Sequence, residues 1–220
     1  MIAWLKGALE AIAEVIWPRG VQCLCCDELS DGELLCPLCA SELRNLRLPD
    51  GTGVVRSVYP YRGVARKLVL GLKFGPLKDA ACVLSEAMAE EALAMRLPEN
   101  TILTWVTMPD RRRRARGIDH GRTLCTALGK RLGLPVKKLL IRTRRSRTQR
   151  SLSAAQRQAN LLGAFACTEK LTAPVLLIDD VTTTGATIRI CSRMLLDSGA
   201  PQVYALTAAR VEKRGDMDEI

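Results

Sequence analysis

The amino-acid sequence predicts a parallel α/β sheet flanked by helices, preceded by a small unit built on cysteines. Three observations support this prediction. Stretches typical of strands alternate with stretches typical of helices over the C-terminal half of the chain. An all-apolar run at residues 175–178 ends abruptly in two carboxylates, as a buried parallel strand does. Five cysteines cluster near the N-terminus, so we expect two parts, residues 1–45 and residues 46–220.

Each element is predicted from a local pattern of residue types. Residues 54–61 are rich in β-branched and aromatic side chains, which predicts a strand, and the spacing of Val64, Leu68 and Leu72 predicts a helix. Pro76 and Pro98 bound a second helix, because proline is favoured just before a helix and after its end. In chain order we expect strand 54–61, helices 64–74 and 79–97, strand 101–108, helix 119–132, short strands near 136–141 and 164–167, strand 175–178, helix 187–198 and strand 202–208.

Composition excludes several classes of protein. The chain has 220 residues, 48% hydrophobic and 25% charged, which supports a sizeable core and is unlike a disordered chain. Its longest apolar stretches are strand-sized, well short of the roughly 18 residues that a membrane span needs. Glu10 and Glu14 interrupt the apolar N-terminal stretch, so we expect an amphipathic docking helix instead of a signal peptide. Nine cysteines without a secretion signal then predict the cytoplasm, a reducing compartment.

Two cysteine pairs near the N-terminus predict a structural zinc site. Cys23, Cys26, Cys36 and Cys39 follow the pattern Cys-x2-Cys-x9-Cys-x2-Cys. Two such pairs supply the four thiolates that tetrahedral Zn²⁺ prefers, and four protein ligands leave no open position for catalysis. Cys25 could in principle replace Cys23 or Cys26, although the pair spacing favours Cys25 as a bystander.

The strongest motif for ligand chemistry begins at the end of the apolar run. Asp179 and Asp180 come directly after the predicted strand, at the sheet edge where open α/β sheets bind ligands. The hydroxyl- and glycine-rich turn 182–187 then opens a helix, whose backbone N–H groups can hold a phosphate. In this order the two acids could hold ribose hydroxyls or a bridging metal, and the turn could hold a 5′-phosphate. The alternative interpretation is that both acids only cap the turn.

Basic residues concentrate in the middle of the chain. The formal net charge is +10, yet residues 106–160 hold 16 Lys and Arg against two acids, so the rest of the chain is slightly acidic. Such a region attracts polyanions, either phosphorylated small molecules or nucleic acid. Aromatic residues are only 4% of the chain, which weakens a base-stacking interpretation of the arginine runs.

Several motifs in order resemble one family over nearly the full length. They are the run 175–187, the short runs Tyr61-Arg-Gly, Leu72-Lys73-Phe74, Met108-Pro109 and Arg116-Gly117, and the stretches 142–153 and 157–165. The run 175–187 resembles the ribose-phosphate signature of type I phosphoribosyltransferases. The chain as a whole resembles the ComF family, ComFC-like proteins associated with DNA uptake in natural transformation.

The resemblance implies a type I phosphoribosyltransferase-like domain that binds phosphoribosyl pyrophosphate with Mg²⁺. Asp179 and Asp180 would hold the ribose hydroxyls at the catalytic centre. The 5′-phosphate would lie on Thr182, Thr183, Thr184, Gly185 and Thr187. The pyrophosphate, or another polyanion, would meet Lys73, Arg113, Arg114, Arg116 and Arg142, with residues 142–150 in a loop closing over the ligand. The family also agrees with a zinc unit at the four cysteines.

The chain departs from the family pattern beside the expected pyrophosphate site. The family usually has an aromatic residue and Asn where Ile118 and Asp119 stand, and Thr where Ser146 stands. Asp119 could repel a pyrophosphate or help to place Mg²⁺. His120, the only histidine, lacks an accompanying nucleophile motif, so we expect it to be solvent-exposed or a hydrogen-bonded structural residue. Lys73 could meet a phosphate or be a surface lysine.

Three functions from different classes follow from these residues. A phosphoribosyltransferase would release pyrophosphate to an acceptor that the sequence does not identify. A non-catalytic module on the same scaffold would bind single-stranded DNA through the arginine runs. An adaptor would bind another protein, such as a DNA helicase or a translocation component, through the N-terminal unit. The absence of aromatic residues among the arginines favours the first function over the second, whereas five arginines within residues 111–116 exceed the need of one pyrophosphate and favour the second.

Overall fold

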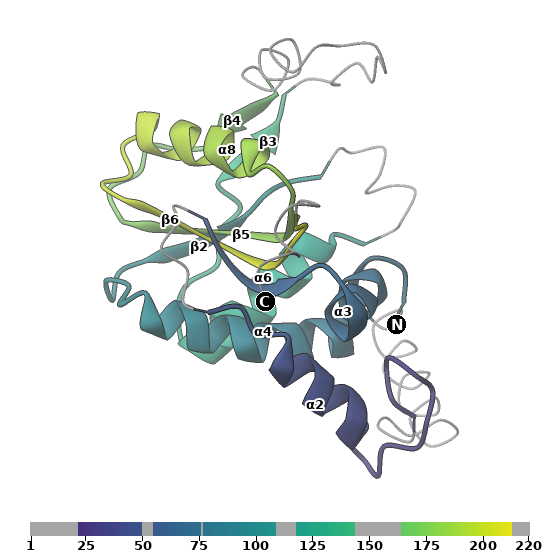
Figure 1. Ribbon diagram of the computed structural model, residues 1–220. Coiled ribbons are helices and arrows are strands. Elements are labelled where there is room, and N and C mark those ends of the chain that lie inside the picture. Colours follow the sequence, from purple (N-terminus) through teal and green to yellow (C-terminus); the bar gives the residue numbers. More distant parts are fainter. Residues whose placement is uncertain (1–21, 50–54, 76, 109–117, 144–163, 213–220) are drawn as a thin grey trace, which may run out of the picture.

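A four-stranded parallel sheet forms the centre of the molecule (Figure 1). The computed structural model describes residues 22–49, 55–75, 77–108, 118–143 and 164–212. The strands lie in the order β1-β6-β5-β2, and all three neighbouring pairs are parallel. Their bounds are β1 Arg56–Pro60, β2 Ile102–Trp105, β5 Val175–Thr182 and β6 Val203–Arg210. The parallel sheet predicted from the sequence is therefore confirmed.

Helices cover both faces of this sheet (Figure 1). Helices α3 (Gly63–Phe74), α4 (Leu77–Ala94) and α6 (His120–Leu132) share one core with the β5 residues Leu176 and Ile178. Helix α8 (Ala186–Asp197) shares the opposite core with Val175 and Leu177. Successive strand residues point to opposite faces, so the all-apolar run 175–178 reflects burial on both sides.

Two short strands leave the main sheet, contrary to the simple alternation expected from the sequence. β3 (Leu140–Arg142) and β4 (Phe165–Cys167) pair antiparallel as a separate two-stranded sheet on the α8 side. Val136 makes one parallel bridge to Leu103 before the chain departs from β2. The stretch predicted as a single strand at 136–141 is thus divided between two sheets, because its two ends pack on different partners.

The N-terminal unit contains a helix that the sequence analysis did not predict. Helix α2 spans Pro37–Asn45, with Pro37 at its start, and the Cys36 Sγ accepts a hydrogen bond from the Cys39 N–H at 3.5 Å. Its buried residues Cys39 and Leu43 belong to the same core as α3 and α4. The expected boundary at residue 45 falls where α2 ends, although the core continues across it.

Some predictions fall on residues outside the described ranges. These are the N-terminal helix, the arginines Arg113, Arg114 and Arg116, Ser146, and most of the closing loop 142–150. Among the described residues, no helix is long and apolar enough to cross a membrane.

Candidate functional site

Strand β5 delivers Asp179 and Asp180 to the carboxyl end of the sheet. The strand is paired on both sides, with β2 at Ile178 and with β6 through Asp179 opposite Thr207. By strand periodicity Asp180 shares a face with Leu176 and Ile178, and Asp179 shares the opposite face. Two carboxylates that are adjacent in sequence therefore meet different helices.

Asp180 is a buried carboxylate held by donors from three elements. Its Oδ1 accepts a hydrogen bond from the Val181 N–H at 2.7 Å. Its Oδ2 lies 2.9 Å from the Lys73 Nζ of α3 and 3.1 Å from the His120 Nε2 of α6. Burial by itself would raise the pKa of Asp180, but the hydrogen bond from His120 and the charge of Lys73 lower that pKa to about 2. Asp180 is therefore a fixed negative charge.

Asp179 has the opposite electrostatic character. Its Oδ1 accepts a hydrogen bond from the Asp180 N–H at 2.9 Å. Desolvation by the surrounding protein and the negative charge of Asp180 raise the pKa of Asp179 well above its usual value. The charge of Asp179 also raises the pKa of Cys191 on α8, after burial, which fits a side chain on the α8 face. Adjacent groups with pKa values moved in opposite directions are typical of functional sites.

The turn after β5 leaves the start of α8 open. Gly185 precedes the helix with φ +70°, a left-handed conformation that favours glycine, and no side chain caps the helix there. Thr183 and Thr184 are exposed, while Thr182, Gly185 and Thr187 are half-buried. The Ala186 N–H makes only a long contact of 3.4 Å with the Thr184 Oγ1. Such a turn offers backbone donors and a helix dipole to an anion.

Arg189 is a cation beside this turn that the sequence analysis did not single out. A Cβ built on Gly185 would lie 2.9 Å from the Arg189 Nη1, so the guanidinium covers the turn. Residue 189 is four positions after Gly185, one helical turn along α8. This spacing is the signal in the sequence that could have identified it.

The side chains of Lys73 and His120 both lie next to the Asp180 carboxylate. The Lys73 side chain is 19% exposed and its ammonium is paired with Asp180, which is not the environment of a surface lysine. The side chain of His120 is 13% exposed, so the histidine is not solvent-exposed, and its Nε2 lies 3.1 Å from the Asp180 carboxylate. The role of Lys73 toward a pyrophosphate stays a prediction.

Asp119 has a clear local role in the folded chain. Its Oδ1 accepts a hydrogen bond from the Arg122 N–H at 3.1 Å and so caps the start of α6. Its Oδ2 accepts a hydrogen bond from the Trp105 Nε1–H at 3.2 Å, which ties α6 to the end of β2. Both carboxylate oxygens are thus engaged by donors of the protein itself.

Arg142 is the last residue of β3. Its guanidinium carbon lies 5.0 Å from the centre of the Phe165 ring on β4, within the range of a cation–π contact. Its positive charge lowers the pKa of Cys191, which places it near the α8 face on which Asp179 lies. The polyanion role expected of Arg142 stays a prediction, as do those of Arg113, Arg114 and Arg116.

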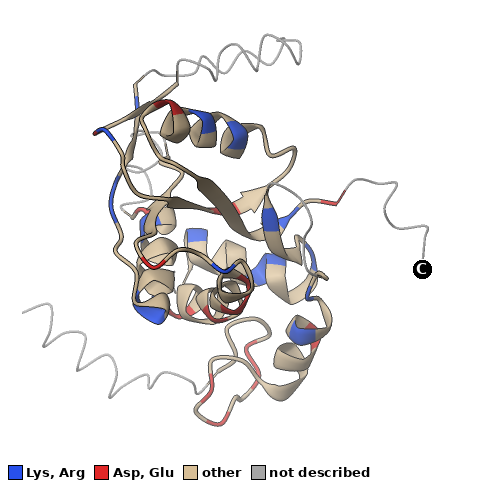
Figure 2. Cartoon of the chain, turned by 90° about the vertical axis from the view of Figure 1, so that its left-hand side faces the viewer, with Lys and Arg blue, Asp and Glu red and all other residues tan. Residues whose placement is uncertain are grey.

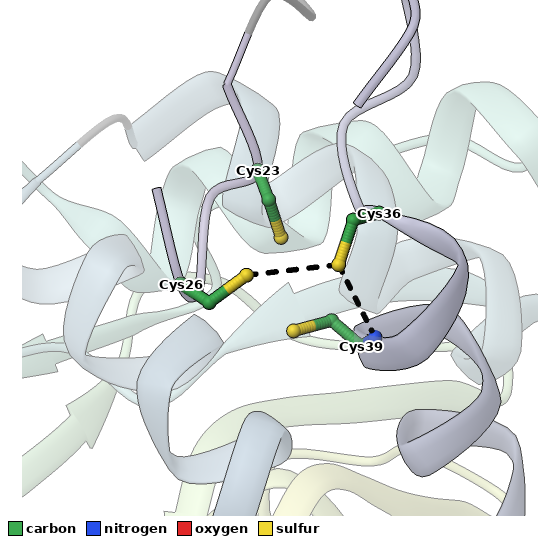
Figure 3. Close-up of side chains that lie close together, drawn as sticks. All are labelled: Cys23, Cys26, Cys36 and Cys39. Carbon is green, nitrogen blue, oxygen red and sulfur yellow. Dashed lines mark hydrogen bonds between the residues drawn. The ribbon is translucent and has the colours of Figure 1, made fainter. Parts of the chain in front are cut away.

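The four predicted cysteine ligands come together in the N-terminal unit. Figure 3 shows their sulfurs converging, with Cys23 and Cys26 on a loop and Cys36 and Cys39 at the start of α2. All four sulfurs lie within 4.8 Å of one another, and those of Cys26 and Cys36 are 3.6 Å apart. Sulfurs of a tetrahedral zinc–thiolate site are about 3.8 Å apart, so these thiols could hold a zinc ion.

Cys25 stands apart from this cluster. It is half-buried, and burial together with the Cys23 thiol raises the pKa of Cys25 to about 12, which opposes the thiolate form. At Cys23, burial would also raise the pKa, but backbone hydrogen bonds from Cys36, Cys25 and Cys26 lower it to about 7. The pKa values of Cys26 and Cys39 are raised as well, so it is the position of Cys25 outside the four-sulfur cluster that agrees with a bystander to a metal site.

Curated relatives identify the family of this chain. The DNA utilization protein YhgH of Salmonella typhi is 30% identical over 209 residues, with 87% of this chain and 90% of the relative covered. YhgH of Escherichia coli K12 is 29% identical over 211 residues, with the same shares covered. The chain belongs to the family of these DNA utilization proteins, and the ComF-family resemblance is confirmed at that level. No family model matches the chain.

Solved structures with partial likeness to the chain are phosphoribosyltransferases and related enzymes. Orotate phosphoribosyltransferase from Aeropyrum pernix is 19% identical, with 66% of this chain and 64% of that chain covered and a TM-score of 0.39. Glutamine phosphoribosylpyrophosphate amidotransferase from B. subtilis is 18% identical, with 63% of this chain and 30% of that chain covered and a TM-score of 0.43.

Proposed function

We propose that this chain binds the Mg²⁺ complex of phosphoribosyl pyrophosphate at the carboxyl end of its sheet and acts in the cytoplasm in DNA uptake. One observation carries the proposal. Two carboxylates, the half-buried Asp179 and the buried Asp180, lie near the end of β5, one short turn before the uncapped start of α8. Carboxylates can accept hydrogen bonds from the ribose hydroxyls, and a helix start can bind the phosphate, so together they suit a ribose 5-phosphate group.

The two halves of the site divide the ligand between them. The 5′-phosphate would lie at residues 182–187, against the backbone N–H groups, the threonine hydroxyls and the Arg189 guanidinium. The ribose hydroxyls would donate hydrogen bonds to Asp179 and Asp180. Charge-assisted hydrogen bonds of this kind are worth about 1.5–3 kcal/mol each.

Transfer of the phosphoribosyl group is the reaction that suits this ligand. The bond between C1 of the ribose and the pyrophosphate oxygen breaks, the electron pair leaves with pyrophosphate, and an acceptor nucleophile bonds to C1. Mg²⁺ that arrives with the substrate neutralises charge on the leaving group. Cations of the chain would assist in this, and the candidates are Lys73, Arg142 and the arginines Arg113, Arg114 and Arg116.

A role in DNA uptake is supported by the relatives and by charge. The relatives are named DNA utilization proteins, and residues 106–160 carry 16 basic side chains against two acids. Such a field would favour single-stranded DNA as a second ligand. A DNA helicase or a translocation protein is the partner class we expect. On the described surface, acidic residues mark the loop of the N-terminal unit at the bottom of Figure 2, a region that would repel DNA.

Calorimetric titration with Mg²⁺-phosphoribosyl pyrophosphate tests the proposal. The wild type should bind saturably, and the double variant Asp179→Asn, Asp180→Asn should bind at least about 100-fold more weakly, because two charge-assisted hydrogen bonds are lost. The matched control is Asp197→Asn, which removes an exposed acid of α8 that pairs with Arg193 at 3.0 Å. It should bind as the wild type does.

Two results would contradict the proposal. A folded wild type that does not bind the ligand would leave the chain as a non-catalytic module on this scaffold. Equal binding by the wild type and the double variant would place the ligand elsewhere. If the wild type binds the ligand and the double variant does not, a pyrophosphate-release assay on the same samples, with candidate acceptors, would distinguish a transferase from a protein that only binds the ligand.

A further inference from the structure

We propose that His120 is a positioning residue of the ligand site, which acts with Lys73 to orient the Asp180 carboxylate. The inference rests on the proposed function, because the oriented carboxylate is the one that would receive a ribose hydroxyl. It concerns a residue that neither the sequence motifs nor the relatives' names assign to the site.

The contacts at Asp180 form a two-sided clamp on one oxygen. Lys73 Nζ reaches Oδ2 from α3 at 2.9 Å, and His120 Nε2 reaches the same atom from α6 at 3.1 Å. The Val181 N–H holds the other oxygen at 2.7 Å. The side chains of Asp180, His120 and Lys73 are only 8%, 13% and 19% exposed, so water competes little with these contacts.

The imidazole is itself held in place by the start of α6. His120 is the first residue of that helix, directly after its cap, Asp119, which also accepts the hydrogen bond from Trp105 on β2. Gly121 follows, and a Cβ there would come within 3.0 Å of the Trp105 ring. This close packing fixes the helix start against the sheet, so the ring position is set by the fold.

The two ring nitrogens have different surroundings. Nε2 lies 3.1 Å from the Asp180 Oδ2, whereas Nδ1 is buried; among the described residues neither Oδ2 nor Nδ1 has a hydrogen bond of good geometry. Because Nε2 is the ring nitrogen that lies near a carboxylate, we expect the tautomer that carries its proton on Nε2. With its proton on Nε2 the ring is within reach to donate to the Asp180 Oδ2, as the histidine of a catalytic triad donates to its carboxylate, but here the histidine would orient the acid.

Loss of the clamp has a defined consequence. Lys73 alone provides charge but little direction, since an ammonium on a flexible stem makes no fixed angle with the carboxylate. Without the Nε2–H donor, Asp180 would sample other orientations and ligand affinity would fall. A loss of about tenfold corresponds to about 1.4 kcal/mol, the value of one hydrogen bond to a charged group.

Two substitutions at one position test the inference. His120→Gln retains an N–H donor near the place of Nε2, whereas His120→Leu has similar volume and no donor. In titrations with Mg²⁺-phosphoribosyl pyrophosphate, His120→Gln should recover most of the wild-type affinity, and His120→Leu should bind about tenfold more weakly. Thermal melts of both variants report whether the fold is kept. Wild-type affinity in a folded His120→Leu variant would overturn the proposal, as would equal losses in both variants.

A spectroscopic measurement separates this inference from the proposed function. The chain has one histidine, so ¹⁵N spectra of the imidazole contain a single set of ring signals. If the imidazole contacts Asp180, the substitution Asp180→Asn should shift these signals in the ligand-free protein. A freely exchanging imidazole that is unchanged in Asp180→Asn would overturn the clamp. Absence of ligand binding by the wild type would instead refute the proposed function, and with it the role in orienting a ligand, while the signal still reports the contact itself.

Discussion

At the residue scale, Asp179 and Asp180 are neighbours in sequence with opposite electrostatic environments. Asp180 is surrounded by the cationic or N–H groups of Lys73, His120 and Val181. Asp179 lies on the other face of β5, where desolvation and the charge of Asp180 raise its pKa. Asp180 therefore stabilises the folded chain as an anion, whereas the charge on Asp179 costs stability.

Single substitutions should separate the two roles. Asp180→Asn leaves the Lys73 ammonium without its counterion and should lower the free energy of unfolding by about 1–3 kcal/mol. Asp179→Asn keeps an oxygen acceptor for the Asp180 N–H and removes a costly charge, so it should raise the melting temperature at neutral pH while weakening ligand binding. Thermal and urea unfolding of the two variants checks this, and a more stable Asp180→Asn would contradict it.

The pH dependence of these effects follows from the direction of each shift. The pKa of Asp180 is lowered to about 2 in the folded chain, so its contribution is present above about pH 4 and is lost as pH falls toward 2. The pKa of Asp179 is raised, so its penalty grows as pH rises above about 4. The melting-temperature gain of Asp179→Asn should therefore shrink on acidification, and the loss in Asp180→Asn should be constant between neutral pH and about pH 5.

The sequence could predict these acids but not their partners. An apolar strand that ends in two acids marks the sheet edge from residue types alone, and the turn 182–187 adds the phosphate-binding chemistry. The convergence of Lys73 and His120 on one oxygen depends on how α3 and α6 pack on the same face of the sheet. No spacing in the sequence encodes a contact between residues that are 107 and 60 positions from Asp180.

At the element scale, the four-cysteine unit and the sheet were predictable to different degrees. Cysteine spacing predicted the cluster because ligands at fixed short separations must converge on one ion. Helix α2 was missed, although Pro37 at its start and the cap by Cys36 are recognisable start signals. The β3–β4 pair was assigned to the wrong kind of sheet, since three-residue strands carry too little periodicity to specify their partners.

The zinc site expected at the four cysteines can be tested by measuring the metal content of the protein. Purified protein should contain one equivalent of zinc, and Cys26→Ser should lose it. Because metal binding stabilises only the folded chain, the melting temperature should fall by about 10 °C. Cys25→Ser is the matched control, one position away and outside the four-sulfur cluster, and should keep its zinc. Metal loss in both variants, or in neither, would contradict the assignment.

At the scale of the whole molecule, one core connects the four-cysteine unit to the sheet that carries Asp180. The cysteine unit packs against α3 and α4, and its core is continuous with the helices on the Asp180 face of the sheet. The same α3 carries Lys73 to that carboxylate. We therefore expect the N-terminal unit to support the position of α3, and through it the orientation of Asp180.

A crystal structure of the protein with Mg²⁺ and phosphoribosyl pyrophosphate would show whether the ligand occupies the carboxyl end of the sheet. We expect the 5′-phosphate at the start of α8, with oxygens about 2.9 Å from backbone N–H groups of residues 183–187, and the ribose hydroxyls on Asp179 and Asp180. Electron density for the ligand elsewhere on the chain, with the start of α8 free of phosphate, would contradict the proposed ligand site.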